Sequence, residues 1–253
     1  MATSTARRKR SSRTGTSTLT VAGLEVQVVR KQIKNLHLGV YPPAGRVRVA
    51  VPVAMNDEAV RLAVIGKLGW IKRQRAGFAA QPRQTSREMV NGESHYFQGR
   101  RYRLRVISGG TVAKVRIVGS AVIELAVPKR ATRQKRETVL NHWYREQLRA
   151  LAAPLIETWQ KVLGVEARSW GIQRMKTKWG SCNPDTKRIL LNLELAKKHP
   201  ACVEYLVVHE LVHLIERRHN DRFIALMDAN LPKWRQYKKA LNAEPLGHEE
   251  WGY

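Results

Sequence analysis

The stretch Val207-Val208-His209-Glu210-Leu211-Val212-His213-Leu214-Ile215-Glu216-Arg217-Arg218-His219 decides how the rest of the chain is interpreted. In a helix, His209 and His213 lie one turn apart, so their imidazoles project from the same face. That spacing suits two ligands of a tetrahedral zinc ion, and Glu210 can then reach a metal-activated water without binding the metal. The surrounding residues are apolar almost all round, which predicts a buried helix. Buried imidazoles and carboxylates are costly unless paired or metal-bound, so the stretch predicts a metal site.

A third ligand is needed to complete such a site. His219 follows His209 by ten residues, which in a straight helix places it about 15 Å further along and about 80° around the axis. We therefore expect the chain to bend after about Ile215, so that His219 returns to the other two histidines. The alternative is a carboxylate ligand, Glu216 or Asp221.

The composition limits the class of protein. The 253 residues include 46 Lys and Arg against 20 Asp and Glu, a formal net charge of +26, which favours contact with polyanions such as nucleic acid. Cys182 and Cys202 are too few for a disulfide framework. The sequence contains no run of about 18 apolar residues, so it predicts no membrane span. The segment from Met1 to Arg13 lacks the apolar core of a secretory signal. We expect a cytoplasmic protein with no membrane contact.

The pattern along the chain predicts an α+β fold. Residues 1–18 are expected to be a disordered basic tail, 19–128 a β-rich domain with one helix, 129–243 the metal-binding domain and 244–253 a loose tail. Asn56 is the expected cap of the one N-terminal helix. Strands are expected at 24–30, 35–40, 46–51, 95–106, 112–118, 121–127 and 188–193, and a long helix at about 130–163, with Pro154 inside it.

Several ordered motifs resemble a known family. They are Trp179-Gly180-Ser181-Cys182-Asn183, Ile189-x-Leu191-Asn192-x-x-Leu195, Tyr205-x-x-x-His209-Glu210-Leu211-x-His213-Leu214 and His219-x-x-x-Phe223. In the first half they are Arg30-Lys31, Val49-x-Val51-Pro52, Trp70-Ile71 and Gly99-x-x-Tyr102-x-Leu104. This series resembles the YgjP-like metal-dependent hydrolases, which are related to the SprT-like and minigluzincin zinc peptidases. Ile224 and Leu193 depart from the aromatic residues common in the family, at positions that would shape a pocket wall.

The resemblance implies a zincin-like (minigluzincin) domain with a long helix, a β-hairpin and an active-site helix. His209, His213 and His219 would be the Zn²⁺ ligands and Glu210 the general base of a zinc metallopeptidase. The expected substrate is a peptide or protein, and the basic charge suggests proteins associated with nucleic acid. The alternative function is a nucleic-acid-associated binding protein with a structural or latent zinc site.

The sequence also suggests supporting roles near the site. Arg174, Lys176 and Lys178 are candidates for stabilising an oxyanion. A substrate peptide is expected to add to the edge of the strand at 188–193. No histidine partner is evident for Ser181 or Cys182, so the loop that contains them is interpreted as structural.

Overall fold

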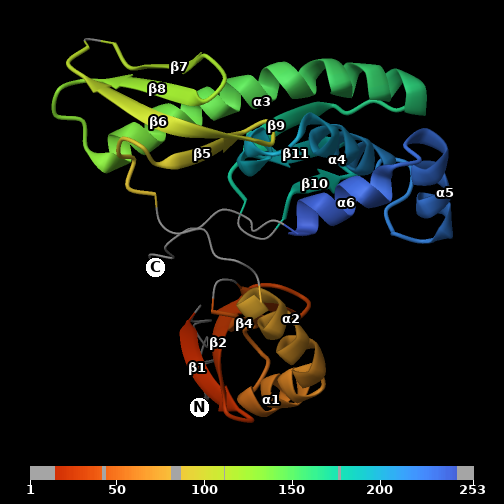
Figure 1. The fold of residues 1–253 in the computed structure, drawn as a ribbon. Helices are drawn as coiled ribbons and strands as arrows, with labels where there is room; N and C mark the ends of the chain where they lie inside the picture. The colour runs from red at the N-terminus through yellow and green to blue at the C-terminus, as the bar shows by residue number, and fades with distance from the viewer. Residues whose placement is uncertain (1–14, 42–43, 81–86, 111, 176–177, 244–253) are drawn as a thin grey trace, which may run out of the picture. The chain divides into compact units, whose positions relative to one another are not determined.

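The computed structural model describes residues 15–41, 44–80, 87–110, 112–175 and 178–243, and it divides the chain into two compact units, 1–81 and 82–253 (Figure 1). Helices and three small mixed sheets make up the described residues, which confirms the predicted α+β class. None of the described helices combines the length and apolar character that a membrane span requires.

The first unit is a four-stranded sheet followed by two helices. Its elements are β1 (Thr16–Val21), β2 (Leu24–Lys31), β3 (His37–Tyr41), β4 (Arg46–Pro52), α1 (Asp57–Ile65) and α2 (Leu68–Ala80). The strand order is β1-β2-β4-β3, with β2 and β4 parallel and the two outer pairs antiparallel. Alternating valines of β2 and β4 pack against Val60, Val64 and Ile71 of the helices, so the helices close the core of this sheet.

Two features of the first unit differ from the sequence prediction. β1 extends into the segment expected to be a disordered tail, because its residues pair in register with β2, from Thr16 opposite Val29 to Val21 opposite Leu24. The single helix expected after Asn56 is two helices. Asn56 caps α1 by accepting a hydrogen bond from the Ala59 amide at 2.8 Å, and α1 ends at Ile65 before Gly66. Residues 1–14 lie outside the described residues.

The second unit begins with another four-stranded sheet. Its strands are β5 (Ser94–Phe97), β6 (Arg100–Ser108), β7 (Lys114–Val118) and β8 (Val122–Val127), in the order β5-β6-β8-β7. The segment 95–106, expected to be one strand, is a hairpin, because Gln98 and Gly99 take positive φ angles of 49° and 78° and reverse the chain. The long helix α3 (Arg133–Leu163) packs on this sheet and includes Pro154, as predicted.

The two four-stranded sheets share one topology. Each begins with a hairpin closed by a two-residue turn, Ala22–Gly23 or Gln98–Gly99, in which both residues have positive φ. Each then has a parallel central pair, β2 with β4 or β6 with β8, and a last antiparallel pair. The tripeptide Ala-Val-Pro stands at the end of both fourth strands, at residues 50–52 within β4 and at 126–128, where Pro128 directly follows β8. The shared strand order, the two matching turns and this tripeptide indicate an internal repeat.

The remaining elements hold the predicted metal site. They are β9 (Ser169–Gln173), β10 (Gly180–Asn183), β11 (Arg188–Asn192), the 3₁₀ helix η1 (Leu193–Lys197), α4 (Pro200–Val212), α5 (Asp221–Asn230) and α6 (Trp234–Ala243). The third sheet has the order β10-β11-β9, with β10 and β11 antiparallel and β9 and β11 parallel. Figure 1 shows α4 lying between α3 and α6.

One core joins these elements to the second sheet. Leu104, Ile123 and Leu125 of the sheet belong to the same buried cluster as Leu140 of α3 and Val208 of α4. The compact units therefore divide at Gln81, whereas the sequence suggested a boundary after residue 128. The sequence-based boundary followed the change from strands to helices, but in the fold the sheet and the helix that follows it bury one another.

Candidate metal centre

The helix α4 brings two of the three histidines together inside the core. It begins at Pro200, and His199 caps it by accepting a hydrogen bond from the Ala201 amide at 3.2 Å. Nine of its thirteen residues are buried, including Tyr205, Glu210 and Leu211. Because the helix is apolar on all sides, it is packed in the interior as predicted, and its few polar groups lie in a medium that penalises charge.

One further turn follows the end of α4 before the chain changes direction. The helix ends at Val212, and His213 is its C-cap with helical φ and ψ. The amides of Leu214 and Ile215 then bond the carbonyls of Leu211 and Val212 at 2.9 Å, which tightens the end. The amide of Glu216 also bonds the carbonyl of Val212 at 2.9 Å, so the turn continues through Ile215 and the chain bends after about this residue, as expected. Asn220 caps α5 by accepting a hydrogen bond from the Phe223 amide at 3.0 Å, and this new helix start fixes the segment that carries His219.

The bend brings His219 beside the other two histidines. One ring nitrogen from each of His209, His213 and His219 lies within 4.8 Å of the others. The Nε2 atoms of His209 and His219 are 3.1 Å apart, and the three ring centroids are 4.7–5.0 Å from one another. Phe223 lies against all three rings, with centroid distances of 4.7–5.0 Å. The buried Phe223 thus forms an apolar support under the cluster.

The donor atoms of the cluster fit a divalent metal. His213 directs Nδ1 at the carbonyl oxygen of Glu216, 3.0 Å away, which leaves its Nε2 free to bind. Two imidazole nitrogens at 3.1 Å need a proton or a cation between their lone pairs. Tetrahedral zinc with bonds of 2.0–2.1 Å would separate two such nitrogens by about 3.3 Å. Three imidazoles therefore fit zinc here, and the same donors accept other divalent metals.

Electrostatics favour the neutral form of His209 and His219. Burial, followed by the charges of His213, His219 and Lys238, lowers the pKa of His209 to about 3. Burial is also the largest cause that lowers the pKa of His219, with smaller contributions from His213 and Lys238. A metal ligand must present an unprotonated nitrogen, so both shifts favour metal binding at neutral pH.

Glu210 is a buried carboxylate without a hydrogen bond from any described residue. Its side chain is 4% exposed, and burial raises its pKa to about 8, while Lys178 acts in the opposite direction. A Cβ atom at Gly180 would lie only 2.5 Å from Glu210 Oε1, so the backbone of β10 passes directly against the carboxylate. A buried acid that lacks a structural partner is available for proton transfer.

Two side chains near Glu210, Cys182 and Tyr205, are held in their neutral forms. The pKa of Cys182 is raised to about 11 by burial and by the charge of Glu210. The same two causes raise the pKa of Tyr205 to about 12. Cys182 is therefore a protonated thiol in this environment, which disfavours a role as nucleophile or metal ligand.

The third sheet corrects the expected position of a substrate strand. β11, the strand expected at 188–193, lies in the middle between β10 and β9, so neither of its edges is free. β10 is an outer strand and, through Gly180, is the strand beside Glu210. Addition of a peptide to β11 is excluded, because its backbone groups are already paired on both sides.

The three candidate cations before β10 have different surroundings. Arg174 is ion-paired with Glu137 at 3.1 Å. Lys178 is exposed, and its charge acts on Glu210. Lys176 lies outside the described residues. Of the two candidates that the structure describes, Lys178 is the exposed one without an ion pair.

A buried asparagine that the sequence reasoning missed positions this segment. Asn192 is fully buried, and its amide donates hydrogen bonds to the carbonyls of Met175 at 2.8 Å and Lys178 at 2.7 Å. Its Oδ1 accepts from the amides of Met175 and Glu194. The signal available in the sequence was a polar residue at the end of an apolar strand, and in the structure this residue also caps η1.

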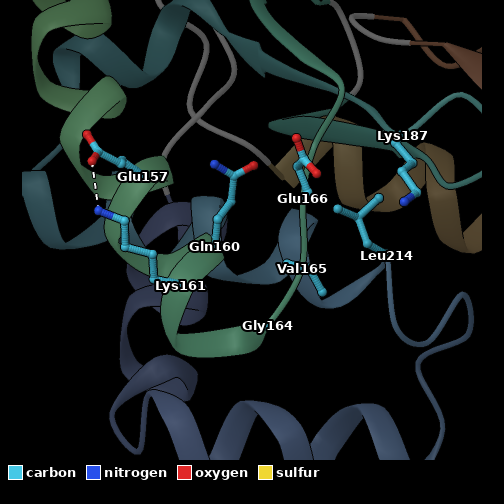
Figure 2. Close-up of a pocket in the computed structure, with 8 residues that line it drawn as sticks. All are labelled: Glu157, Gln160, Lys161, Gly164, Val165, Glu166, Lys187 and Leu214. Carbon is cyan, nitrogen blue, oxygen red and sulfur yellow. Dashed lines mark hydrogen bonds and ion pairs between the residues drawn. The ribbon is translucent and has the colours of Figure 1, made fainter.

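A separate hollow of about 560 Å³ opens at the end of α3 (Figure 2). It is lined by Glu157, Gln160, Lys161, Gly164, Val165, Glu166, Lys187 and Leu214. Glu157 and Lys161 pair with each other at 2.9 Å along the helix. Its lining includes none of the three clustered histidines and no buried acid.

Comparison with known proteins gives a family, and solved structures similar to this chain include a metallopeptidase zymogen. The sequence model of the YgjP-like metallopeptidase domain matches residues 34–244, which include all three histidines and Glu210. No curated protein matches the chain. The chain is 18% identical to the metallopeptidase zymogen of Pyrococcus abyssi abylysin, known from a crystal structure. The match covers 36% of this chain and 90% of that one, with a TM-score of 0.34.

Proposed function

Since the chain belongs to the YgjP-like metallopeptidase family, we propose that it is a zinc-dependent peptidase in which His209, His213 and His219 hold the metal. Glu210 is the general base in this proposal. One observation carries it: three imidazoles meet within 4.8 Å, and a buried carboxylate without a hydrogen-bond partner among the described residues follows the first of them. A structural metal site has no need of such a carboxylate.

Glu210 moves the proton in the proposed reaction. A bound divalent ion would supply Lewis acidity, which polarises the substrate carbonyl and makes water a better acid. The Glu210 carboxylate accepts a proton as water attacks the carbonyl carbon, and it delivers that proton to the amide nitrogen as the carbon–nitrogen bond breaks. Burial raises the pKa of Glu210 to about 8 in the chain alone, and a nearby cation favours the ionised form. The two influences together would hold the carboxylate near the pKa that suits a base at neutral pH.

The substrate is proposed to lie along β10. Its outer edge has no strand partner among the described residues, so an extended peptide can form a ladder of backbone hydrogen bonds there. Gly180 then places the scissile bond beside Glu210. Lys178, exposed near the same carboxylate, is proposed to stabilise the negative charge that develops on the carbonyl oxygen.

The net charge of +26 supports two further proposals. The first is that the substrates include proteins associated with nucleic acid. The second is the alternative function of a nucleic-acid-associated protein whose zinc site is structural or latent. We also propose a cytoplasmic location, since both cysteines are free.

The decisive experiment measures zinc content and casein cleavage in the wild type, Glu210→Gln and Glu58→Gln. Glu58 is an exposed acid on α1 and serves as the matched control. We expect about one zinc per chain in all three and cleavage in the wild type and the control, with a loss of about 10²- to 10⁴-fold in Glu210→Gln. Equal cleavage by Glu210→Gln would exclude the base role. Stoichiometric zinc without cleavage in any of the three would favour the alternative function, and absence of bound metal would overturn the proposal.

A further inference from the structure

A groove of about 570 Å³ runs along the exposed side of α6. It is lined by Trp234, Arg235, Lys238, Lys239 and Asn242. The charged members are all basic, whereas the indole of Trp234 is 6% exposed and provides an apolar floor. A carboxylate next to a short aliphatic stem would match this combination.

Stacked rings connect the groove to the histidine cluster. The ring of Tyr205 contacts that of His209 edge-on, with centroids 5.7 Å apart. On Tyr205 the indole of Trp234 is stacked at 6.3 Å, with an interplanar angle of 13°. Lys238 reaches back over the same indole, with Nζ 5.4 Å from the ring centroid. Its charge is felt by both His209 and His219. The groove is thus a neighbour of the reactive site.

Two lysines in the groove have no acidic partner among the described residues. Arg235 is neutralised, because both of its terminal nitrogens bond the Asp228 carboxylate, which also accepts a hydrogen bond from Trp234 Nε1 at 2.7 Å. Lys238 and Lys239 are exposed and make no such ion pair within the part of the chain that the structure describes. The ammonium groups therefore remain available to an external anion.

We propose that Lys238, with Lys239 beside it, forms a subsite that binds an aspartate or glutamate side chain of the substrate close to the bond to be cleaved. This inference rests on the proposed peptidase function and names a substrate class for it. A carboxylate needs only the one or two cations that the groove offers, whereas a nucleic-acid backbone gains affinity from a longer track of cations. The apolar floor also favours a side chain over a bare phosphate.

The first test measures binding to full-length Glu210→Gln, which holds peptides without cleaving them. Fluorescein-labelled octapeptides with Asp or Glu at one position are compared by anisotropy with the same peptides carrying Asn or Gln. We expect the acidic peptide to bind about three- to tenfold more tightly, and this preference to shrink as salt is raised. Lys238→Gln should remove the preference, and Lys238→Glu should reverse it. Lys114→Glu, an exposed lysine on β7, is the charge-matched control and should leave it unchanged.

The outcomes separate the subsite from the peptidase function. Equal binding of acidic and amide peptides, or a preference that survives Lys238→Glu, overturns the subsite whether or not the wild type cleaves peptides. A preference that depends on Lys238 supports the subsite even when casein cleavage is absent, and the peptidase proposal then fails separately. If Lys238→Glu weakens binding of a single-stranded oligonucleotide and leaves peptide discrimination intact, the groove is a nucleic-acid site and the proposal is wrong.

Discussion

The two four-stranded sheets have the same strand order, but their first turns have different surroundings. In the first unit the turn Ala22–Gly23 is open, and a Cβ at Gly23 would meet nothing within 4 Å. In the second the turn Gln98–Gly99 is docked. The amides of Gln98 and Gly99 donate hydrogen bonds of 3.0 Å to the carbonyls of Ala196 and Lys197, and a Cβ at Gly99 would lie 3.2 Å from His199 Cα.

The turn Gln98–Gly99 contacts the residues that lead into α4. Ala196 and Lys197 belong to η1, and His199 is the cap of α4. Among the described residues, the turn of the first sheet has no such partner, and α1 and α2 close the core of that sheet. The same sheet topology therefore occurs in two settings: in one its core is closed by its own two helices, and in the other its first turn supports the start of α4. All of the clustered metal-binding groups among the described residues belong to the second unit.

The largest expected effect removes a histidine from the cluster. His213→Ala should weaken zinc binding by more than about 100-fold and abolish cleavage, because it removes one proposed ligand together with its bond to the Glu216 carbonyl. His37→Ala, an exposed histidine on β3 of the first unit, is the matched control and should keep both. Zinc content and casein cleavage are the measurements. Stoichiometric zinc in His213→Ala would contradict the proposal that His213 is a metal ligand.

The next effect concerns the space beside Glu210. Gly180→Ala places a Cβ against the carboxylate, so Glu210 must shift. A displacement of about 1 Å near the reacting groups costs about 10²-fold in rate, so kcat should fall by that order while zinc content is unchanged. The control is Gly171→Ala in β9 of the same sheet, where the nearest atom to a new Cβ is Leu190 Cδ2 at 3.5 Å, an ordinary contact. Equal kcat values for the two variants would show that the carboxylate position is not critical.

A smaller effect compares the two turns directly. Both Gly23 and Gly99 have positive φ, so alanine costs about 1 kcal/mol at each site. At Gly99 the added Cβ also presses on His199, which should destabilise the second unit by about 1 kcal/mol more. Calorimetry can follow both units in each variant. If both substitutions cost the same, the docked turn is not a support for α4.

The meeting of the three histidines could be predicted from the sequence because these residues are close together in the chain. Eleven residues contain three histidines and Glu210, and helical geometry alone places His209 beside His213. Gly180 contacts Glu210, and Asn192 bonds the carbonyls of Met175 and Lys178, so these interactions join segments that are distant in the sequence. No local sequence pattern predicts such contacts. Their residues appeared in quoted motifs, but the motifs did not state what they contact.

The fold was predicted in class and in most elements, but the repeat was missed. Periodicity located β2, β4 and α3, because each buries one regular face. The two sheets differ in almost every side chain, so the repeat becomes visible in strand order and turn conformation instead. The turn Gln98–Gly99 was read as part of one strand, since the flanking residues keep alternating through it.

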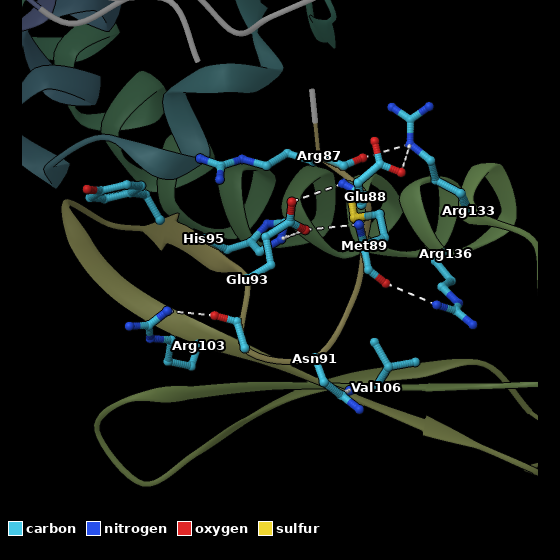
Figure 3. A network of polar contacts seen from close by, with 12 residues as sticks. Arg87, Glu88, Met89, Asn91, Glu93, His95, Arg103, Val106, Arg133 and Arg136 are labelled. Atoms are coloured by element: carbon cyan, nitrogen blue, oxygen red, sulfur yellow. Dashed lines mark hydrogen bonds and ion pairs between the residues drawn. The ribbon is translucent and has the colours of Figure 1, made fainter. Parts of the chain in front are cut away.

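The smallest expected effect concerns a buried histidine of the second sheet. His95 on β5 is 4% exposed and lies 3.0 Å from Glu93, whose carboxylate also accepts hydrogen bonds from the amides of Glu88 and Met89 (Figure 3). Burial lowers the pKa of His95 below 6.5, and the contact with Glu93 opposes this shift. Unlike Glu210, Glu93 is saturated with partners, which indicates a structural role.

The sign of the pH dependence follows from this lowered pKa. Below pH 6.5 the unfolded chain binds a proton at His95 more readily than the folded chain does. The stabilisation from neutral His95 is therefore complete above that pH, and the free energy of unfolding declines as the pH falls. The slope is at most about 1.4 kcal/mol per pH unit. His95→Gln should flatten the acid side of the stability curve of the second unit, whereas His37→Gln in β3 should not. An acid side that steepens in His95→Gln would mean that the Glu93 contact outweighs burial, because the folded state would then hold the proton more tightly than the unfolded chain does.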